Sequence, residues 1–398
     1  MKNRELKKFD ILLSLSVFLL ALSVAITKVF SLNISLAVFN FTISVVPFIY
    51  IIFKSKRIRF YKSNQNFVLF YIIFIRFVTS ILSFSSLSNS EILVQVCNDL
   101  SLAIILLAFF SIDNSKSEEY EMHYFPKTLI ISSLIYSIYN ILSNLNNFVY
   151  FTNIKFRYLI SFSSFFNNKN LFGVFIFVAL IACDYYLENH SSKNKIFFLI
   201  KAFLIINLLL TVSRNAIFAY AIYYLLYNFF NKKYKKILLL LISFFILFLF
   251  NFMNIQNFIV NFLIRSDSLT SGRTEIWQKC FEYAFKRPVI GYGEIMIENT
   301  INSFTGVVST HNWFIKLFIN GGLVNLVCYL LLIVNQLEAS INNIRKKSKY
   351  STVIFSSLIA IIAYGFFEEI NLFEFGLINV IFTIYFMFLP KILRGKEA

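Results

Sequence analysis

The three histidines of the chain are its best candidates for proton transfer, and only one of them is well placed. His123 and His190 fall in basic segments between apolar stretches, whereas His311 directly precedes the apolar stretch that begins at Asn312. The free N–H groups and the dipole of a helix N-terminus favour anions, and an imidazole transfers protons near neutral pH. We therefore expect His311 to serve as a base or to orient a hydroxyl group; a structural role is the alternative.

Arginine supplies the second chemical signal, because a guanidinium group binds phosphate oxygens in a bidentate manner. Arg214 occupies a short turn between two apolar stretches, and Arg265, Arg273 and Arg287 share one long polar segment. Arg76 falls inside an apolar stretch, where an unpaired cation costs at least about 2.5 kcal/mol in a bilayer. We expect these side chains to bind an anionic substrate, with Arg214 and Arg273 foremost; snorkelling at the membrane interface is the alternative.

An aromatic residue and several glutamates complete the candidate set. Trp277 follows Arg273 by four residues and shares its helical face, so its indole is placed either to stack on a sugar ring or to anchor at the membrane interface. The alternative bases are Glu294, Glu298, Glu368, Glu369 and Glu374. The sequence has no Asp-x-Asp pair and too few histidines for a His-rich site. We therefore expect neither a metal ion nor a cofactor.

The elements that position these residues are membrane-spanning helices. Of the 398 residues, 58% are hydrophobic and only 14% are charged, and the mean hydropathy is +0.71. Soluble domains carry about 25% charged residues. A membrane β-barrel needs segments that alternate between apolar and polar residues, whereas the apolar stretches here are long and unbroken. The sequence therefore predicts an all-α, polytopic membrane protein.

Because a spanning helix needs about 20 apolar residues, the sequence predicts about 12 transmembrane helices and one large extracytoplasmic loop. The candidate spans are residues 9–27, 33–53, 66–85, 92–112, 126–145, 171–187, 196–212, 216–231, 237–253, 312–335, 352–370 and 373–389. The aromatic segment 148–166 is an alternative further span. We expect about nine helices in residues 1–253, a loop with short helices in 254–310, and about three helices in 311–398. One short helix is expected from about 271 to 287.

The net charge of +17 reports membrane topology and contact with membrane lipids, not binding of nucleic acid. About 25 of the 37 lysines and arginines lie in segments 1–8, 54–62, 116–127, 193–201, 232–236, 345–349 and 391–396. These segments fall at every second junction between apolar stretches, as the positive-inside rule predicts for cytoplasmic loops. Both termini are therefore expected in the cytoplasm and the large loop outside. The basic N-terminal segment and the apolar stretch after it are expected to form a retained first helix.

Three sequence blocks, in this order and around one large loop, resemble the O-antigen polymerase and ligase family (Wzy/WaaL-like). The blocks are LTVSRNA at 210–216, SGRTEIW at 271–277 followed by PVIGYG at 288–293, and THNW at 310–313 running on to GG at 321–322. The element NNKN at 167–170 is also similar to one in the family. Two positions depart from the family pattern: Asn215 stands where Gly is common, and Lys169 where Pro is common. These differences bear on the subtype and substrate.

The resemblance implies a C-type glycosyltransferase architecture that acts on a polyprenyl-pyrophosphate-linked oligosaccharide outside the cytoplasmic membrane. It implies that Arg214 and Arg273 grip the pyrophosphate and that His311 is the base or orients the acceptor. The further substrate-binding candidates are Arg265, Arg287, Trp277 and Arg76. No metal ligand is expected.

Two functions within the family compete, and a third lies outside it. A polymerase joins lipid-linked repeat units, whereas a ligase transfers the finished glycan to lipid A-core or to a protein. We favour the polymerase, because the sequence has no recognisable additional acceptor-binding domain. A flippase for lipid-linked oligosaccharides is the alternative from another class, but it predicts short loops and internal duplication. The resemblance also implies a chain-length regulator and a flippase as protein partners.

Overall fold

The computed structural model describes residues 3–30, 36–55, 64–112, 120–147, 162–189, 195–239, 242, 273–294 and 309–392. Within these ranges the chain forms helices and turns and no strand, which confirms the all-α prediction. The helices are α1 (Asn3–Phe30), α2 (Ala37–Lys54), α3 (Asn64–Ser83), η1 (Phe84–Ser86), α4 (Asn89–Ser111), α5 (Tyr124–Ser143), η2 (Leu145–Asn147), α7 (Lys169–Asn189), α8 (Lys195–Leu210), α9 (Arg214–Phe230), α12 (Arg273–Ala284), α14 (Trp313–Arg345), α15 (Ser351–Gly365), α16 (Leu377–Thr383), η4 (Ile384–Phe388) and α17 (Leu389–Ile392).

The helices agree with a multi-pass membrane protein. Eleven of the twelve expected spans coincide with helices in the described residues. Seven of these helices, α1 to α5, α7 and α14, are long and apolar enough to cross a membrane, and α15 and the α16–α17 segment are shorter apolar helices. Most of the expected span 237–253, most of the loop 254–310 and most of segment 148–166 lie outside the described residues. The total of about 12 spans and the large loop therefore remain predictions.

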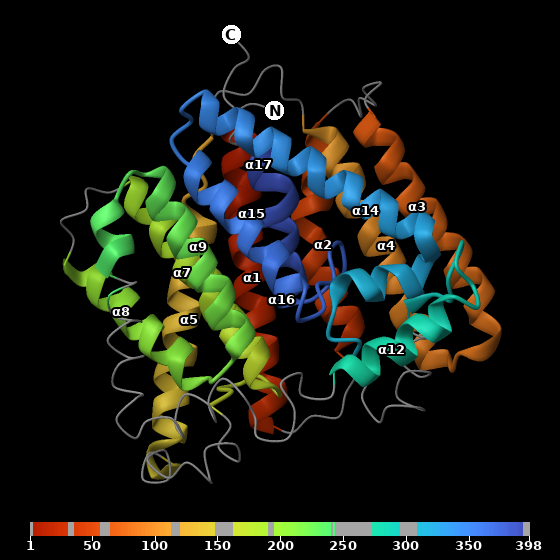
Figure 1. Cartoon of the computed structure of the whole chain (residues 1–398), viewed down its shortest axis with the longest axis horizontal. Helices are drawn as coiled ribbons and strands as arrows, with labels where there is room; N and C mark the ends of the chain where they lie inside the picture. The colour runs from red at the N-terminus through yellow and green to blue at the C-terminus, as the bar shows by residue number, and fades with distance from the viewer. Residues whose placement is uncertain are drawn as a thin grey trace.

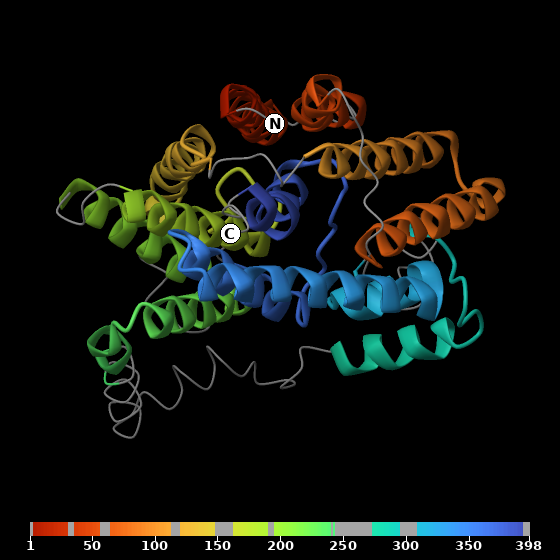
Figure 2. The same ribbon diagram turned by 90° about the horizontal axis from the view of Figure 1, so that it is seen from above.

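The helices form two lateral groups joined by a central one (Figures 1 and 2). Helices α5, α7, α8 and α9 lie on one side and α3 and α4 on the other, with α1 and α16 between them. The long α14 runs across the molecule from one group to the other and packs against α3 at one end and α15 along its length. Helix α12 packs on α14 and lies outside the main bundle.

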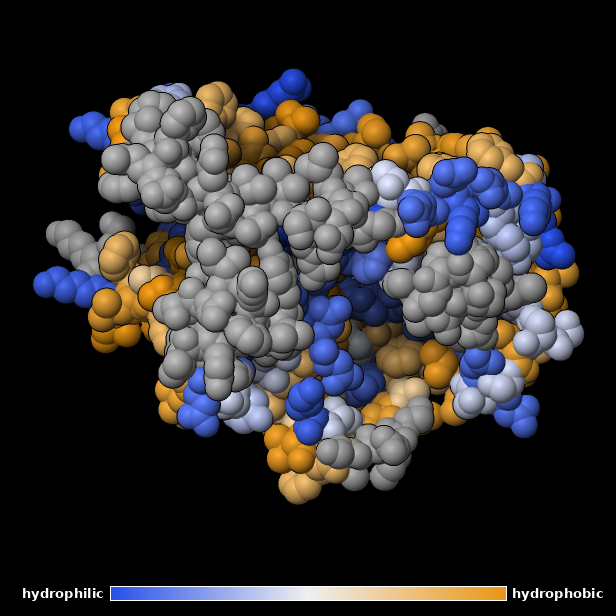
Figure 3. Space-filling view, turned by 60° about the horizontal axis from the view of Figure 1, so that its bottom comes forward, coloured by the Kyte–Doolittle hydropathy of each residue, from blue (hydrophilic) through white to orange (hydrophobic). Residues whose placement is uncertain are grey.

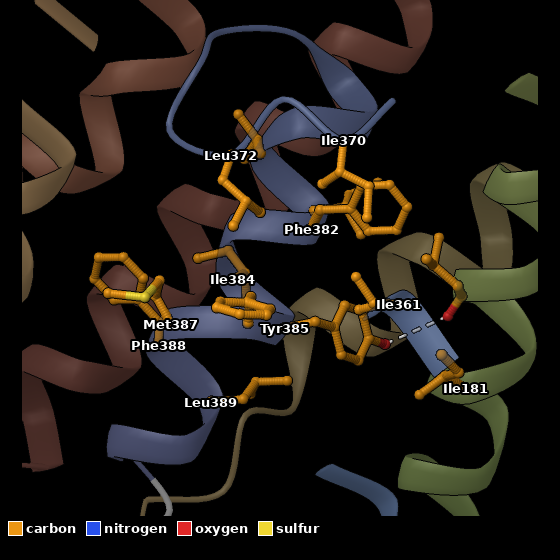
Figure 4. Close-up of a cluster of buried hydrophobic side chains, with 14 of the residues drawn as sticks. Ile181, Ile361, Ile370, Leu372, Phe382, Ile384, Tyr385, Met387, Phe388 and Leu389 are labelled. Atoms are coloured by element: carbon orange, nitrogen blue, oxygen red, sulfur yellow. Dashed lines mark hydrogen bonds between the residues drawn. The ribbon is translucent and has the colours of Figure 1, made fainter. Parts of the chain in front are cut away.

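The segment from α16 to α17 forms the centre of the core because it is hydrophobic on every side. Such a helix is stable only when neighbours surround it. Figure 4 shows its side chains among those of neighbouring helices. The ring of Phe388 packs against Phe9, Phe48 and Phe109, and the Tyr385 hydroxyl donates to the Val178 carbonyl at 3.3 Å. This core therefore positions α7, α9 and α14, whereas α12 packs on α14 through a smaller, separate cluster that includes Cys280 and Ile319.

Candidate functional site

Four helices begin at one place in the structure, and within the described parts of the chain a single carboxylate lies where they meet. Helices α7, α9, α12 and α14 begin at Lys169, Arg214, Arg273 and Trp313. The carboxylate belongs to Glu368, three residues beyond the end of α15. Because each helix N-terminus carries unpaired N–H groups and a partial positive charge, their convergence favours an anion at this point.

The Glu368 carboxylate accepts hydrogen bonds from side chains of all four N-terminal regions. Its Oε1 lies 2.9 Å from Asn170 Nδ2, 2.8 Å from Asn215 Nδ2 and 3.1 Å from an Arg273 guanidinium nitrogen. Its Oε2 lies 3.2 Å from His311 Nδ1. Each donor comes from one of the sequence blocks that carry the family resemblance. Those blocks, far apart in the sequence, therefore supply donors to the same carboxylate. We call the four donor residues around this carboxylate the anion seat.

His311 is held in a conformation that a helix-forming sequence does not adopt by itself. Its φ is +51°, in the left-handed region that non-glycine residues occupy rarely and at a cost. Asn312 fixes the chain directly after it: the Asn312 Oδ1 caps α14 by accepting from the Ile315 N–H at 3.0 Å, and its Nδ2 donates to the Phe366 carbonyl at 3.0 Å. With Nδ1 facing the Glu368 carboxylate, the imidazole favours the proton on Nδ1 and leaves Nε2 to accept another.

The second glutamate of the pair serves a different set of partners. Glu369 Oε1 accepts from the backbone N–H and the hydroxyl of Thr310, at 2.5 and 2.8 Å, and its Oε2 lies 3.3 Å from Lys316 Nζ. The sequence placed both glutamates in a helix that runs to residue 370, which is wrong because α15 ends at Gly365. Gly365 lies against the Trp313 ring, and the Phe366 carbonyl is taken by Asn312. The turn that follows directs the two carboxylates to opposite partners.

A second ionic cluster lies near the anion seat, and Lys316 joins it to Glu369, the residue next to Glu368. The Lys316 ammonium lies 2.9 Å from Glu294 Oε1, and Glu294 Oε2 pairs with Arg76. Arg76 also pairs with Asp99 at 3.1 Å and with Glu374 at 3.4 Å. Among the described residues, the chain of contacts runs from Asp99 through Lys316 to Glu369 and Thr310.

The pKa values of the two glutamates of this cluster are shifted in opposite directions. Burial raises the pKa of a carboxyl group, but the charges of Arg76 and Lys316 outweigh it at Glu294 and hold its pKa well below the usual range. Burial and the neighbouring Glu294 charge raise the pKa of Glu374 well above its ordinary value. The surroundings therefore favour the protonated form of Glu374 and the ionised form of Glu294, each relative to the free side chain. A small cavity of about 30 Å³ adjoins the cluster, lined in part by Arg76, Glu294 and Tyr329.

Glu294 reaches this cluster because the block PVIGYG docks on a break in α14. The sequence predicted one unbroken span over 312–335, whereas the helical conformation is interrupted at Gly321 and Gly322. The freed backbone groups pair with the docked block. Tyr292 N–H donates to the Ile319 carbonyl at 3.0 Å, Gly293 N–H to Asn320 at 2.9 Å, and Leu323 N–H to the Pro288 carbonyl at 2.7 Å.

Gly322 permits this close approach. A Cβ at Gly322 would collide with the Val289 carbonyl oxygen. The glycine pair at 321–322 and the PVIGYG block at 288–293 therefore pack directly against each other.

Of the predicted catalytic residues, His311 and Arg273 meet at Glu368, and Arg214 begins α9 beside them. Arg214 is half-buried, and its neighbour Asn215 donates to the same carboxylate. Trp277 lies close by, and its Nε1 donates to the Thr310 carbonyl at 3.0 Å. The indole therefore ties α12 to the segment that carries His311.

The remaining predicted residues lie elsewhere. Arg76 belongs to the second ionic cluster and not to the anion seat. Arg287 is exposed and lies over the Tyr292 ring, 4.8 Å from its centre. Arg265 and Glu298 lie outside the described residues, as does His190. The expected helix at 271–287 is found as α12, which ends three residues earlier.

Sequence reasoning missed several residues that the structure brings into the two clusters. Lys316 is 5% exposed although it lies inside an apolar stretch, and that position was a usable signal, since a cation there needs a partner. Asn170 and Asn215 gave no signal beyond their motifs. Asp99 lies near the middle of a predicted span and could have been matched to Arg76 by the same argument. Figure 3, turned so that this end of the bundle comes forward, shows hydrophilic side chains gathered in a hollow.

Comparison with known families agrees with the geometry. Residues 199–330 match the family model described as O-antigen ligase. This range includes α9 with Arg214, α12 with Arg273, His311 and the α14 break. No curated protein matches the chain. At family level the match supports a membrane-embedded glycan transferase of the O-antigen type. The predicted resemblance is thus confirmed over residues 199–330, whose match to the O-antigen ligase model is consistent with a Wzy/WaaL-like family.

Proposed function

We propose that the chain is a polysaccharide polymerase that transfers a glycan from a polyprenyl pyrophosphate to a lipid-linked repeat unit. The reaction takes place at the outer face of the cytoplasmic membrane. The observation that carries this proposal is the anion seat, where Arg273, His311 and four helix N-termini surround one carboxylate. A site that concentrates so much positive potential suits a pyrophosphate leaving group.

The chemistry needs three contributions from the protein. The bond between the sugar C1 and the pyrophosphate oxygen breaks while C1 bonds to an acceptor hydroxyl oxygen. His311 takes the hydroxyl proton on Nε2, because Nδ1 already faces Glu368. Arg214 and Arg273 offset the charge that develops on the departing pyrophosphate. His311 keeps the proton until the product has left and then releases it to solvent.

The other predicted residues are proposed for supporting parts. Trp277 holds the His311 segment through Thr310 and presents its ring beside the seat for a sugar. Arg265 and Arg287 bind outer parts of the substrate. Arg76 is proposed to act through Glu294. A chain-length regulator and a flippase are proposed as protein partners of a polymerase.

Single substitutions in the full-length membrane protein test this function. His311→Ala, Arg214→Ala and Arg273→Ala should each abolish long glycan while the protein still reaches the membrane at normal levels. His123→Ala is the matched control, because His123 contacts Lys127 and Tyr124 instead and should keep activity. Normal polymer from His311→Ala would overturn the assignment of the base.

The pool of lipid-linked glycan in a deletion strain tests the type of transfer. A polymerase defect accumulates single repeat units outside the membrane. Accumulated long chains would contradict the polymerase and indicate a ligase, and repeats trapped inside would indicate a flippase.

A further inference from the structure

The Glu368 carboxylate resembles an anionic ligand more than an ordinary structural side chain. It is buried, with 8% of its surface exposed, and its two oxygens face four donors that come from the N-terminal regions of four different helices. A buried carboxylate needs such compensation. One of these donors, Arg273, is however also expected to hold the pyrophosphate of the substrate.

The other nearby glutamate does not share this position. Glu369 is bound by Thr310 and Lys316 and, within the described residues, forms no hydrogen bond or ion pair with Arg273 or His311. Among the carboxylates of the described residues, only Glu368 places its charge at the meeting point of the four helices. Glu368 lies in the turn after α15. Its side chain can therefore move away from the three partners of its Oε1 atom without unwinding any helix.

The two oxygens of Glu368 have separable partners. Oε1 faces Asn170, Asn215 and Arg273, and Oε2 faces His311. A phosphate oxygen in the place of Oε1 would meet the same three donors at the same distances. Oε2 would keep its contact with His311 and so hold the imidazole ready to accept a proton through Nε2.

We propose that Glu368 is a positioning residue that occupies the anion seat in the substrate-free protein, yields Arg273 to the substrate pyrophosphate, and keeps His311 oriented during transfer. This inference rests on the proposed function. It adds that the Glu368 carboxylate competes with the substrate pyrophosphate for the same donors, so that pyrophosphate binding must displace the carboxylate. Loss of the charge at Glu368 should therefore strengthen anion binding and weaken catalysis together, a combination that a purely structural residue would not produce.

Two substitutions of Glu368 in the full-length protein in detergent or nanodiscs separate these effects. Inorganic pyrophosphate is the binding probe, and polymer formation from lipid-linked repeat units reports kcat and KM. For Glu368→Gln we expect the Kd for pyrophosphate to fall about tenfold, which corresponds to 1.4 kcal/mol, and kcat to fall about 10²-fold because His311 loses its carboxylate. Glu368→Asp keeps the charge and should restore weaker pyrophosphate binding.

Glu121→Gln is the matched control, since Glu121 is exposed and pairs with Lys349 at 3.0 Å. This control should change neither the Kd for pyrophosphate nor kcat. If Glu368→Gln binds pyrophosphate no more tightly than wild type while Arg273→Ala still weakens binding, the Glu368 inference fails and the proposed function stands. If wild type binds no pyrophosphate and Arg273→Ala changes nothing, the proposed function itself fails.

Discussion

Substitution of Gly322 by Ala tests the joint between the docked block and α14. The φ and ψ of Gly322 are +71° and −170°, a backbone region open almost only to glycine, and a side chain there costs about 1–3 kcal/mol in strain. The added Cβ would also collide with the Val289 carbonyl, so residues 288–293 must move away. Three backbone hydrogen bonds join this block to α14. At about 1 kcal/mol each, their loss adds about 3 kcal/mol.

Gly376→Ala is the matched control for this prediction. Gly376 has a φ of +112° and ψ of 158°, so an Ala there suffers comparable backbone strain. Its Cβ would meet nothing closer than Asn379 Nδ2 at 3.8 Å. Gly376→Ala therefore measures strain alone, and Gly322→Ala measures strain together with undocking of the block.

Amide hydrogen exchange on the purified protein measures directly whether the three backbone hydrogen bonds between the docked block and α14 are lost. A loss of about 3 kcal/mol corresponds to exchange faster by about 10²-fold. We expect this acceleration at the amides of Tyr292, Gly293 and Leu323 in Gly322→Ala but not in Gly376→Ala. Glycan synthesis should fall in parallel, because Glu294 leaves Arg76 and Lys316. Unchanged protection of these three amides in Gly322→Ala would refute the docking argument.

Two further predictions concern protons and metal. Glu374 has a raised pKa in the folded protein, so the folded state binds the extra proton and stability falls as pH rises above about 4.5. Glu374→Gln should therefore raise the Tm at pH 8 and lose this advantage near pH 4.5, as thermal unfolding at both pH values would show; an equal Tm at pH 8 contradicts it. Polymer formation should also continue with a strong chelator, because Arg214 and Arg273 offset the pyrophosphate charge. Activity that disappears with chelator and returns with magnesium or manganese would overturn this.

The sequence by itself was sufficient to place the helices and to name part of the site. Long apolar stretches predict helices because a backbone in lipid must satisfy its own hydrogen bonds, and the observed helices follow them closely. His311 and Arg273 could be named because a polar residue at the start of a helix is visible in the local sequence. Their motifs also lie within one region of the chain.

Tertiary packing alone decided which distant charges meet. Asn170 is 198 positions from Glu368, and Arg76 is 218 positions from Glu294 and 298 from Glu374. Periodicity describes neighbours three and four residues apart, so it cannot choose among partners on other helices.

The same reason explains the errors at two helix boundaries. The break at Gly322 and the end of α15 at Gly365 depend on contacts with the docked block and with Trp313. The sequence thus determined that cations and a histidine lie at the ends of helices. The packing of those helices determined that Glu368 lies between them, because only the folded bundle brings four N-termini to one point.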